Sequence, residues 1–224
     1  MSDNLLTTVK KNLGREGQAA TDEIARTIIA LTDVRLEACA DEAIYKPQGA
    51  PVEAGLIKFL MQNDYHLDGA GIARTMKYRN SDETRKVACL PFDQALKRKV
   101  VIRYLPSNPD AARIYVQGAP EEVMDLCKYM HNIKSPQSPL PKNRQENDYL
   151  HRSVEDMACA GLKVFSLAYK DILIEEMANH NDESKEFRSL VEKDLTYLCT
   201  FGFEDTLRDG VTDSIMEIMT GTKV

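Results

Sequence analysis

Apolar positions with helical spacing mark the first part of the chain. After Thr21, a suitable helix N-cap, Ile24, Ile28 and Leu31 recur every three or four positions, as residues do along the buried face of a helix. Pro51 suits the first position of a later helix, where its missing N–H costs nothing. The helices predicted here are residues 22–43, 51–63 and a shorter one at 71–78.

Strand-like runs follow, of which TRKVACLPF, KRKVVIRYL and ARIYVQG are the first three. They are short, apolar and separated by turn residues. The predicted strands are residues 84–92, 97–105, 112–118, 162–171 and 194–205. The helices predicted between and after them are residues 120–130, 149–160, 182–194 and 210–221, with a proline-rich loop at 134–148. This order predicts an α+β fold, an antiparallel β-sheet of about five strands flanked by helices.

The composition narrows the class of function. The 224 residues carry a net charge of −6 and a pI near 5.3, which argues against a nucleic-acid-binding protein. No apolar run of about 18 residues occurs, and the first residues lack a secretory signal. Five cysteines without C-x-x-C spacing predict reduced thiols, most of them in the core, and the four histidines have no metal-site spacing.

The stretch VQGAPEEVMDLC, residues 116–127, places a glycine between a predicted strand and a predicted helix. Two interpretations of Gly118 stay open: it makes a tight strand-to-helix turn, or its missing side chain lets another molecule approach the backbone. Glu121 and Glu122 occupy the first helical turn, where a phosphate would otherwise bind. Because no P-loop or dinucleotide-binding motif occurs either, the stretch is not a phosphate cradle of the P-loop kind.

Phe92 is followed by three consecutive cations, Lys97, Arg98 and Lys99. An aromatic face can stack on a purine, and a nearby lysine supplies a charge for phosphate. For these residues alone, a core phenylalanine beside a solvated basic turn is the simpler explanation. Lys163, at the beginning of a predicted strand, is likewise either a phosphate ligand or a surface lysine.

Five segments together resemble the nucleotide-binding domain of P-type ATPases, the cation pumps that pass through an aspartyl phosphate. They stand in the family's order over roughly residues 40–224: GAPVEAGLIKF, LPFDQALKRKVVI, VQGAPEEVMDLC, AGLKVFSLAYKD and GFEDTLRDGV. The third is close to the family's Lys-Gly-Ala-Pro-Glu segment and the second to its Pro-Phe-x-Ser-x-x-Lys-x-Met segment. DEIARTIIALTDV and LTYLCTFGFEDTLRDGV most resemble plasma-membrane-type calcium pumps.

The resemblance implies a role for each matching position. Phe92 stacks on adenine, Glu53 lies at the adenine amino group, and Lys97 reaches the ring or the phosphates. Lys163 stands where the family has an arginine near the β-phosphate, and Arg208 approaches the nucleotide only once the phosphorylation domain is in place. The ATP-binding residues implied in this way are Glu53, Phe92, Gln94, Lys97, Gln117, Gly118, Ala119, Lys163 and Arg208.

Several positions depart from the family pattern. Gln117 replaces the signature lysine, Val52 replaces the threonine before Glu53, and Lys163 keeps a charge but loses the fork of an arginine. With fewer cations around the phosphates, we expect weak ATP binding by this chain alone. The alternative is a pump-derived domain that has lost nucleotide binding and acts as a scaffold or regulatory module.

The resemblance also implies an organisation and partners. Residues 1–20 would be a linker from the phosphorylation domain, 21–203 the nucleotide-binding domain, and 204–224 the hinge and the start of the phosphorylation domain. The phosphorylated Asp-Lys-Thr-Gly-Thr segment is missing, so we expect the chain to present ATP without hydrolysing it, with Mg²⁺ acting in the parent protein. We expect a monomeric cytoplasmic domain of an integral membrane pump for a cation, by resemblance Ca²⁺. It would contact the actuator and phosphorylation domains, but neither nucleic acid nor the membrane.

Overall fold

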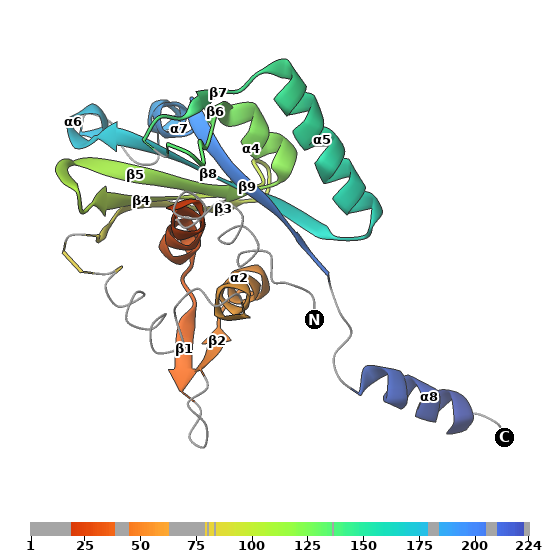
Figure 1. Cartoon of the computed structure of the whole chain (residues 1–224). Helices are drawn as coiled ribbons and strands as arrows, with labels where there is room; N and C mark the ends of the chain where they lie inside the picture. Colours follow the sequence, from red (N-terminus) through yellow and green to blue (C-terminus); the bar gives the residue numbers. More distant parts are fainter. Residues whose placement is uncertain are drawn as a thin grey trace.

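A seven-stranded β-sheet forms the centre of the molecule (Figure 1), in the order β3-β4-β5-β8-β9-β6-β7, and β1 and β2 form a separate two-stranded sheet. The computed structural model describes residues 19–38, 45–62, 79, 81–82, 84–135, 137–178, 184–204 and 210–221. The strands are β1 Arg35–Ala38, β2 Tyr45–Gln48, β3 Lys86–Asp93, β4 Arg98–Leu105, β5 Asn108–Gly118, β6 Cys127–Met130, β7 Leu140–Pro141, β8 Lys163–Leu173 and β9 Leu195–Phe203. The helices are residues 19–31, α2 Pro51–Gln62, α4 Pro120–Leu126, α5 Arg144–Cys159, α6 Ile174–Met177, α7 Lys185–Val191 and α8 Val211–Gly221.

Helices cover both faces of the large sheet (Figure 1). The helix at residues 19–31 and α2 pack on one face, over Val101 and Tyr115. The helices α4, α5 and α7 pack on the other face, over Val100 and Ile114. Because side chains alternate across a strand, β4 and β5 send successive residues to opposite helical layers. The central strands are therefore apolar on both faces and form nearly continuous hydrophobic runs in the sequence.

The predicted α+β class is confirmed. The five predicted strands are β3, β4, β5, β8 and β9, which are antiparallel to their neighbours within this set. Two short strands, β6 and β7, are absent from the prediction, and β6 runs parallel to β9, so the sheet is mixed. The helix predicted up to residue 130 ends at Leu126 instead. Pairing of Tyr129 and Met130 with β9 outweighs their local helical tendency.

The prediction for the first helix is wrong in its second half. The helix ends at Leu31, and residues 35–38 form β1, paired with β2, instead of continuing the helix to residue 43. Thr21 lies inside the helix instead of capping it. A distant residue contacts the C-terminal end of this helix, where the Arg79 guanidinium donates to the carbonyl oxygens of Ile29 and Thr32. Such a contact satisfies groups that helical periodicity alone would leave free.

The helix α5 begins earlier than predicted, at Arg144 instead of Tyr149. Asn143 and Glu146 form a capping box, in which each side chain accepts from the other's backbone N–H at 2.9 and 3.0 Å. This Asn-x-x-Glu pattern is present in the sequence and outweighs the proline-rich loop before it. The helices α7 and α8 lie within their predicted ranges. The helix predicted at 71–78 falls outside the described residues.

The expectation for the cysteines holds only in part. Among the four described cysteines, all unpaired, Cys127 is buried, whereas Cys89 and Cys159 are exposed. Cys89 lies on β3, an edge strand of the sheet.

The helix α8 lies apart from the sheet in Figure 1. The domain boundaries at residues 20 and 203 stay predictions. No helix in the described part of the chain has both the length and the apolar composition needed to cross a membrane.

Candidate functional site

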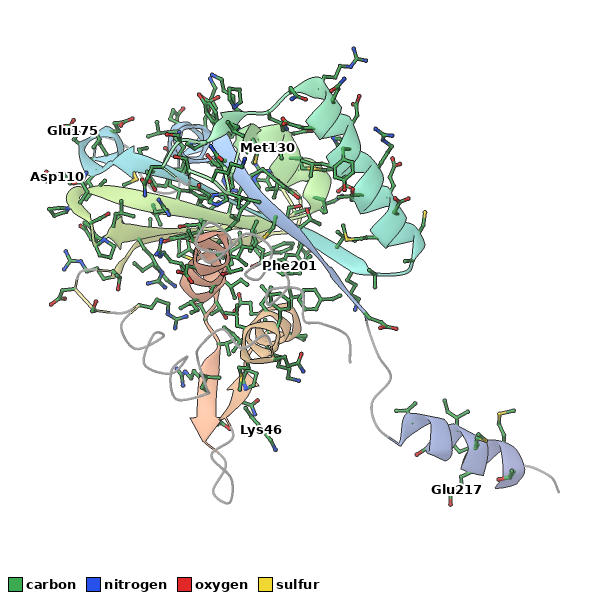
Figure 2. The ribbon with its side chains drawn as sticks, in the orientation of Figure 1. Lys46, Asp110, Met130, Glu175, Phe201 and Glu217 are labelled. Atoms are coloured by element: carbon green, nitrogen blue, oxygen red, sulfur yellow. The ribbon has the colours of Figure 1, made fainter. Side chains whose placement is uncertain are left out.

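Ends of strands and helices from several parts of the chain border one cleft of about 620 Å³. The first turn of α2, the β3–β4 turn and the end of β5 contribute, as do the start of β8 and the end of β9. Figure 2 shows Phe201 of β9 on the side of the sheet that faces α2, and the cleft opens on this side. Seven of the nine predicted site residues line the cleft: Glu53, Phe92, Lys97, Gln117, Gly118, Ala119 and Lys163.

Of the other two predicted residues, only Gln94 lies in the described part of the chain. Gln94 is exposed in the β3–β4 turn and does not line the cleft, although Phe92 before it and Lys97 after it do. Arg208 lies outside the described residues. Within the described ranges, no group of three or more His, Cys, Asp or Glu side chains is arranged to hold a metal ion.

The β3–β4 turn is a fixed part of the cleft wall. The Asp93 carboxylate accepts from the backbone N–H groups of Leu96 at 3.1 Å and Ala95 at 2.8 Å, and these hydrogen bonds lower the pKa of the Asp93 carboxyl. Lys97 adopts a left-handed φ of 50°, which costs a non-glycine residue about 1–3 kcal/mol. The surroundings hold this conformation, since the Lys97 carbonyl accepts from the Ala119 N–H at 2.9 Å.

Phe92 presents an aromatic face to the cleft. It is 59% exposed and stands near the end of the edge strand β3. A core phenylalanine would be shielded from water, so the simpler explanation of this residue is wrong. An exposed ring at the mouth of a cleft is placed to stack on a flat ligand.

Gly118 is required by the sheet itself. A Cβ atom at this position would lie 2.6 Å from both the Lys97 carbonyl oxygen and the Arg98 Cβ atom, which is closer than unstrained contacts allow. The close approach of β4 at the strand-to-helix turn therefore explains the glycine. The space left by its missing side chain is filled by β4 and not by a ligand, although the Gly118 backbone still lines the cleft.

Glu53, in the first turn of α2, is held by three donors. The Lys99 ammonium contacts one carboxylate oxygen at 2.7 Å. The other oxygen accepts from the Asp33 N–H at 2.9 Å and from the Thr32 hydroxyl at 3.2 Å. Lys99 also contacts the Asp33 carboxylate at 3.1 Å. Burial by itself would lower the pKa of Lys99, but the Glu53 and Asp33 carboxylates outweigh it, so the pKa of this ammonium is raised.

Gln117 and Lys97 each bring to the cleft a polar group that has no partner within the described residues. Gln117 Oε1 is buried, and no hydrogen-bond partner for it occurs within the described residues. The Lys97 ammonium has neither an ion pair nor a hydrogen bond in the same part of the chain. A buried acceptor left unpaired costs about 1–3 kcal/mol, which a donor on a ligand would recover. An aromatic face, an unpaired acceptor and an unpaired cation together fit a purine nucleotide.

Eight further cleft residues are absent from the sequence-based prediction of the site, and Lys99, Phe165 and Phe203 are the most informative of them. The sequence marks Lys99 as one of the three cations after Phe92, but only the structure shows that it lines the cleft and pairs with Glu53. Phe165 and Phe203 form an apolar wall, with ring centroids 5.1 Å apart and 15° between the ring planes. Both rings stand among mainly apolar neighbours in their strands, so nothing in the local sequence distinguishes them from core residues.

These features define an α+β domain with an open, partly aromatic cleft at one end of a largely antiparallel sheet. In a comparison with known families, residues 20–210 match the family described as P-type ATPase, cytoplasmic domain N. The chain belongs to this family, and the resemblance of its five segments is thereby confirmed.

The relatives with similar sequences include calcium-transporting ATPases. The chain is 32% identical over 127 residues, 56% of its length, to plasma membrane calcium-transporting ATPase 2 of Oreochromis mossambicus. It is 31% identical over 112 residues, 50% of its length, to endoplasmic reticulum calcium ATPase srcA of Aspergillus fumigatus. It is 25% identical over 171 residues, 76% of its length, to probable calcium-transporting ATPase 8, plasma membrane-type, of Oryza sativa subsp. japonica. The matches span 11%, 11% and 15% of these three relatives.

Proposed function

We propose that this chain is the ATP-binding domain of a P-type ATPase that transports a cation, and that the cation is Ca²⁺. In this role the cleft holds ATP and presents its terminal phosphate to an aspartate in another domain of the parent protein. Family membership and the names of the relatives support the proposal. The observation that carries it is the convergence of seven predicted site residues, from four separate segments, on one cleft.

The walls of the cleft have different roles in this proposal. The exposed Phe92 ring stacks on adenine, and Gln117 Oε1 and the Glu53 carboxylate offer acceptors to the adenine amino group. Lys97 and Lys163 offer positive charge to the phosphates. We expect weak binding, because a lysine supplies a point charge without the fork of an arginine, and position 117 supplies no charge.

ATP supplies the phosphoryl group, and the residues of this chain bind and orient the nucleotide. We place Mg²⁺ with the phosphates in the assembled parent protein, and we propose that Arg208 reaches the nucleotide only when the phosphorylation domain adjoins it. The chain alone is proposed to bind ATP without hydrolysing it, since phosphoryl transfer needs the acceptor aspartate and the metal in place.

Titration of the chain with ATP, followed through backbone amide chemical shifts, tests the proposal. Shifts concentrated at Glu53, Phe92, Gly118 and Lys163 would support it. Tripolyphosphate alone is the control ligand, and it should shift Lys163 without shifting Phe92. A spectrum that does not change at millimolar ATP would contradict the proposal.

One observation favours a second candidate, a pump-derived domain that has lost nucleotide binding and acts as a scaffold or regulatory module. Position 117 carries no charge, and its cross-strand neighbour Lys99 is paired with Glu53 and Asp33. Fewer positive groups therefore remain for phosphates. The same titration separates the two candidates, because this one requires a folded chain whose spectrum ATP leaves unchanged.

A further inference from the structure

Lys99 stands directly opposite Gln117 in the antiparallel β4–β5 pair. Side chains of such cross-strand partners lie next to each other on one face of a sheet, and both residues line the cleft. The Lys99 side chain is only 12% exposed. A largely buried ammonium is tolerated when charged or polar partners compensate for its lost hydration, so the partners of Lys99 indicate its role.

The partners of Lys99 come from two other segments. Glu53 lies in the first turn of α2, at 2.7 Å, and Asp33 lies just after the helix at residues 19–31, at 3.1 Å. The Asp33 N–H and the Thr32 hydroxyl donate to the second oxygen of Glu53. Three donors thus occupy three of the roughly four acceptor positions of this carboxylate. One acceptor position remains on a side chain that lines the cleft.

We propose that Lys99 is a positioning residue for recognition of the nucleobase. Its ammonium fixes the Glu53 carboxylate, so that the remaining acceptor position of Glu53, together with Gln117 Oε1, selects a base with an exocyclic amino group. Lys99 itself does not contact the phosphates. This inference rests on the proposed function and adds to it the determinant of base selectivity.

The distribution of charge supports this division of the cleft. Lys86 contacts the second oxygen of Asp33 at 3.1 Å, so Lys86 and Lys99 together balance the charges of Asp33 and Glu53. A polyanion gains little binding free energy beside a group of side chains whose charges cancel. An amino group can donate hydrogen bonds to the carboxylate oxygens of that group. Lys97, on the β3–β4 turn, has no counter-charge within the described residues and is the better partner for phosphate.

Base selectivity tests the inference, because an ion pair with a merely structural role would not change it. Affinities for ATP, inosine triphosphate and tripolyphosphate are measured by NMR titration of the unaltered chain, Lys99→Met and Lys99→Arg. Inosine triphosphate has a carbonyl group in place of the amino group. We expect the unaltered chain to prefer ATP about tenfold, as for one hydrogen bond to a charged group. Lys99→Met should lose most of this preference, Lys99→Arg should restore it, and tripolyphosphate affinity should stay unchanged.

Lys86→Met is the matched control variant. It removes a cation from the same Asp33 carboxylate, but Lys86 does not line the cleft, so the preference for ATP should stay as it is. A second readout needs no nucleotide. In Lys99→Met the amide signal of Asp33 should shift, because the Glu53 carboxylate that accepts its N–H loses its fixed position.

The outcomes separate this inference from the proposed function. If Lys99→Met loses tripolyphosphate affinity, Lys99 binds phosphate, and the inference is overturned while the proposed function stands. An unchanged ratio of ATP to inosine triphosphate affinity in Lys99→Met overturns the inference in the same way. If the unaltered chain does not bind ATP at all, the proposed function fails and the inference fails with it.

Discussion

The sheet face covered by α2 and the helix at residues 19–31 has polar groups at two places along β5, its middle and its C-terminal end, and the two places differ. In the middle of β5, Arg113 donates to both oxygens of Asp171, at 2.5 and 2.8 Å, and to Glu23 at 2.6 Å. We call Glu23, Arg113 and Asp171 the closed cluster. At the C-terminal end of β5 is the cleft, where Gln117 Oε1 and the Lys97 ammonium have no partner in the described part of the chain.

The contrast separates a structural charge cluster from a binding site. In the closed cluster the donors and acceptors pair with each other, and the Tyr169 ring centroid lies 4.8 Å from the guanidinium carbon of Arg113. Few hydrogen-bonding groups are therefore left for a ligand. In the cleft, unpaired groups raise the free energy of the folded chain, and a ligand that pairs with them lowers it. One helix supports both the closed cluster and the cleft, because Glu23 belongs to it and Asp33 follows it.

Arg113→Met has the largest expected effect, because it opens the closed cluster. The Glu23 side chain, 7% exposed, would keep a buried charge without its strongest partner. Removing one member of a buried ion pair costs about 3–5 kcal/mol, and urea denaturation measures this loss in the free energy of unfolding. ATP binding by the folded fraction should stay unchanged.

The control for this variant is Arg26→Ala. Arg26 contacts the same Glu23 at 2.8 Å, but its side chain is 58% exposed, and an exposed pair contributes less than about 1 kcal/mol. Equal losses from both variants would contradict the role given to the closed cluster. If Arg113→Met does not fold, Arg113→Lys should show an intermediate loss, because it keeps the charge without the fork.

Gly118→Ala tests whether the close approach of β4 requires the glycine. The new methyl group would overlap the Lys97 carbonyl oxygen and Arg98 Cβ, each at 2.6 Å, and overpacking of this kind costs about 1–3 kcal/mol. Because the turn that carries Lys97 must then move, thermal stability and ATP affinity should fall together. Gly161→Ala is the control variant, because Gly161 has a φ of 78° and nothing lies within 4 Å of the added methyl group. This variant should lower thermal stability and leave ATP affinity unchanged. A loss of ATP affinity in Gly118→Ala without a loss of stability would contradict this explanation.

Phe92→Ala tests the prediction that the cleft binds a ligand through an exposed aromatic ring. Loss of stacking should weaken ATP binding by about 1–3 kcal/mol, by analogy with bases stacked on aromatic residues. Stability should change little, because Phe92 is 59% exposed. Phe92→Tyr keeps the ring and should bind nearly as the unaltered chain does. If NMR titration gives Phe92→Ala unchanged affinity while the variant is folded, adenine is held elsewhere.

The substitution His131→Gln has the smallest expected effect, which is on the pH dependence of stability. His131 lies beside the closed cluster. One of its ring nitrogens is 2.9 Å from the Tyr169 hydroxyl, and burial lowers the pKa of His131 from its ordinary value. Below about pH 6.5 the unfolded chain binds a proton that the folded chain binds only at lower pH, so stability falls as the pH decreases. His131→Gln should reduce the difference in urea midpoint between about pH 7.5 and 5.5. An equal difference in both chains would contradict this origin.

Local pattern was sufficient for the parts of the fold that depend on neighbours along the chain. Apolar runs bounded by turn residues predicted the five strands β3, β4, β5, β8 and β9, and Pro51 predicted the start of α2. The short strands were missed because each depends on a partner from elsewhere, as β6 does on the distant β9. The end of the helix at residues 19–31 was missed for the same reason, since the residues of β1 that follow it pair with β2 and Arg79 donates to carbonyl oxygens at that end.

The residue types and their spacing were enough to recognise the family and to point to Phe92, Lys97 and Gln117 as neighbours in one site. Spacing carries this information because it aligns a chain with others of the same fold. It carries no information on exposure or ion pairing, which arise between segments far apart in the chain. Folding therefore decided that Phe92 is exposed, that β4 and not a ligand fills the space beside Gly118, and that Lys99 pairs with Glu53.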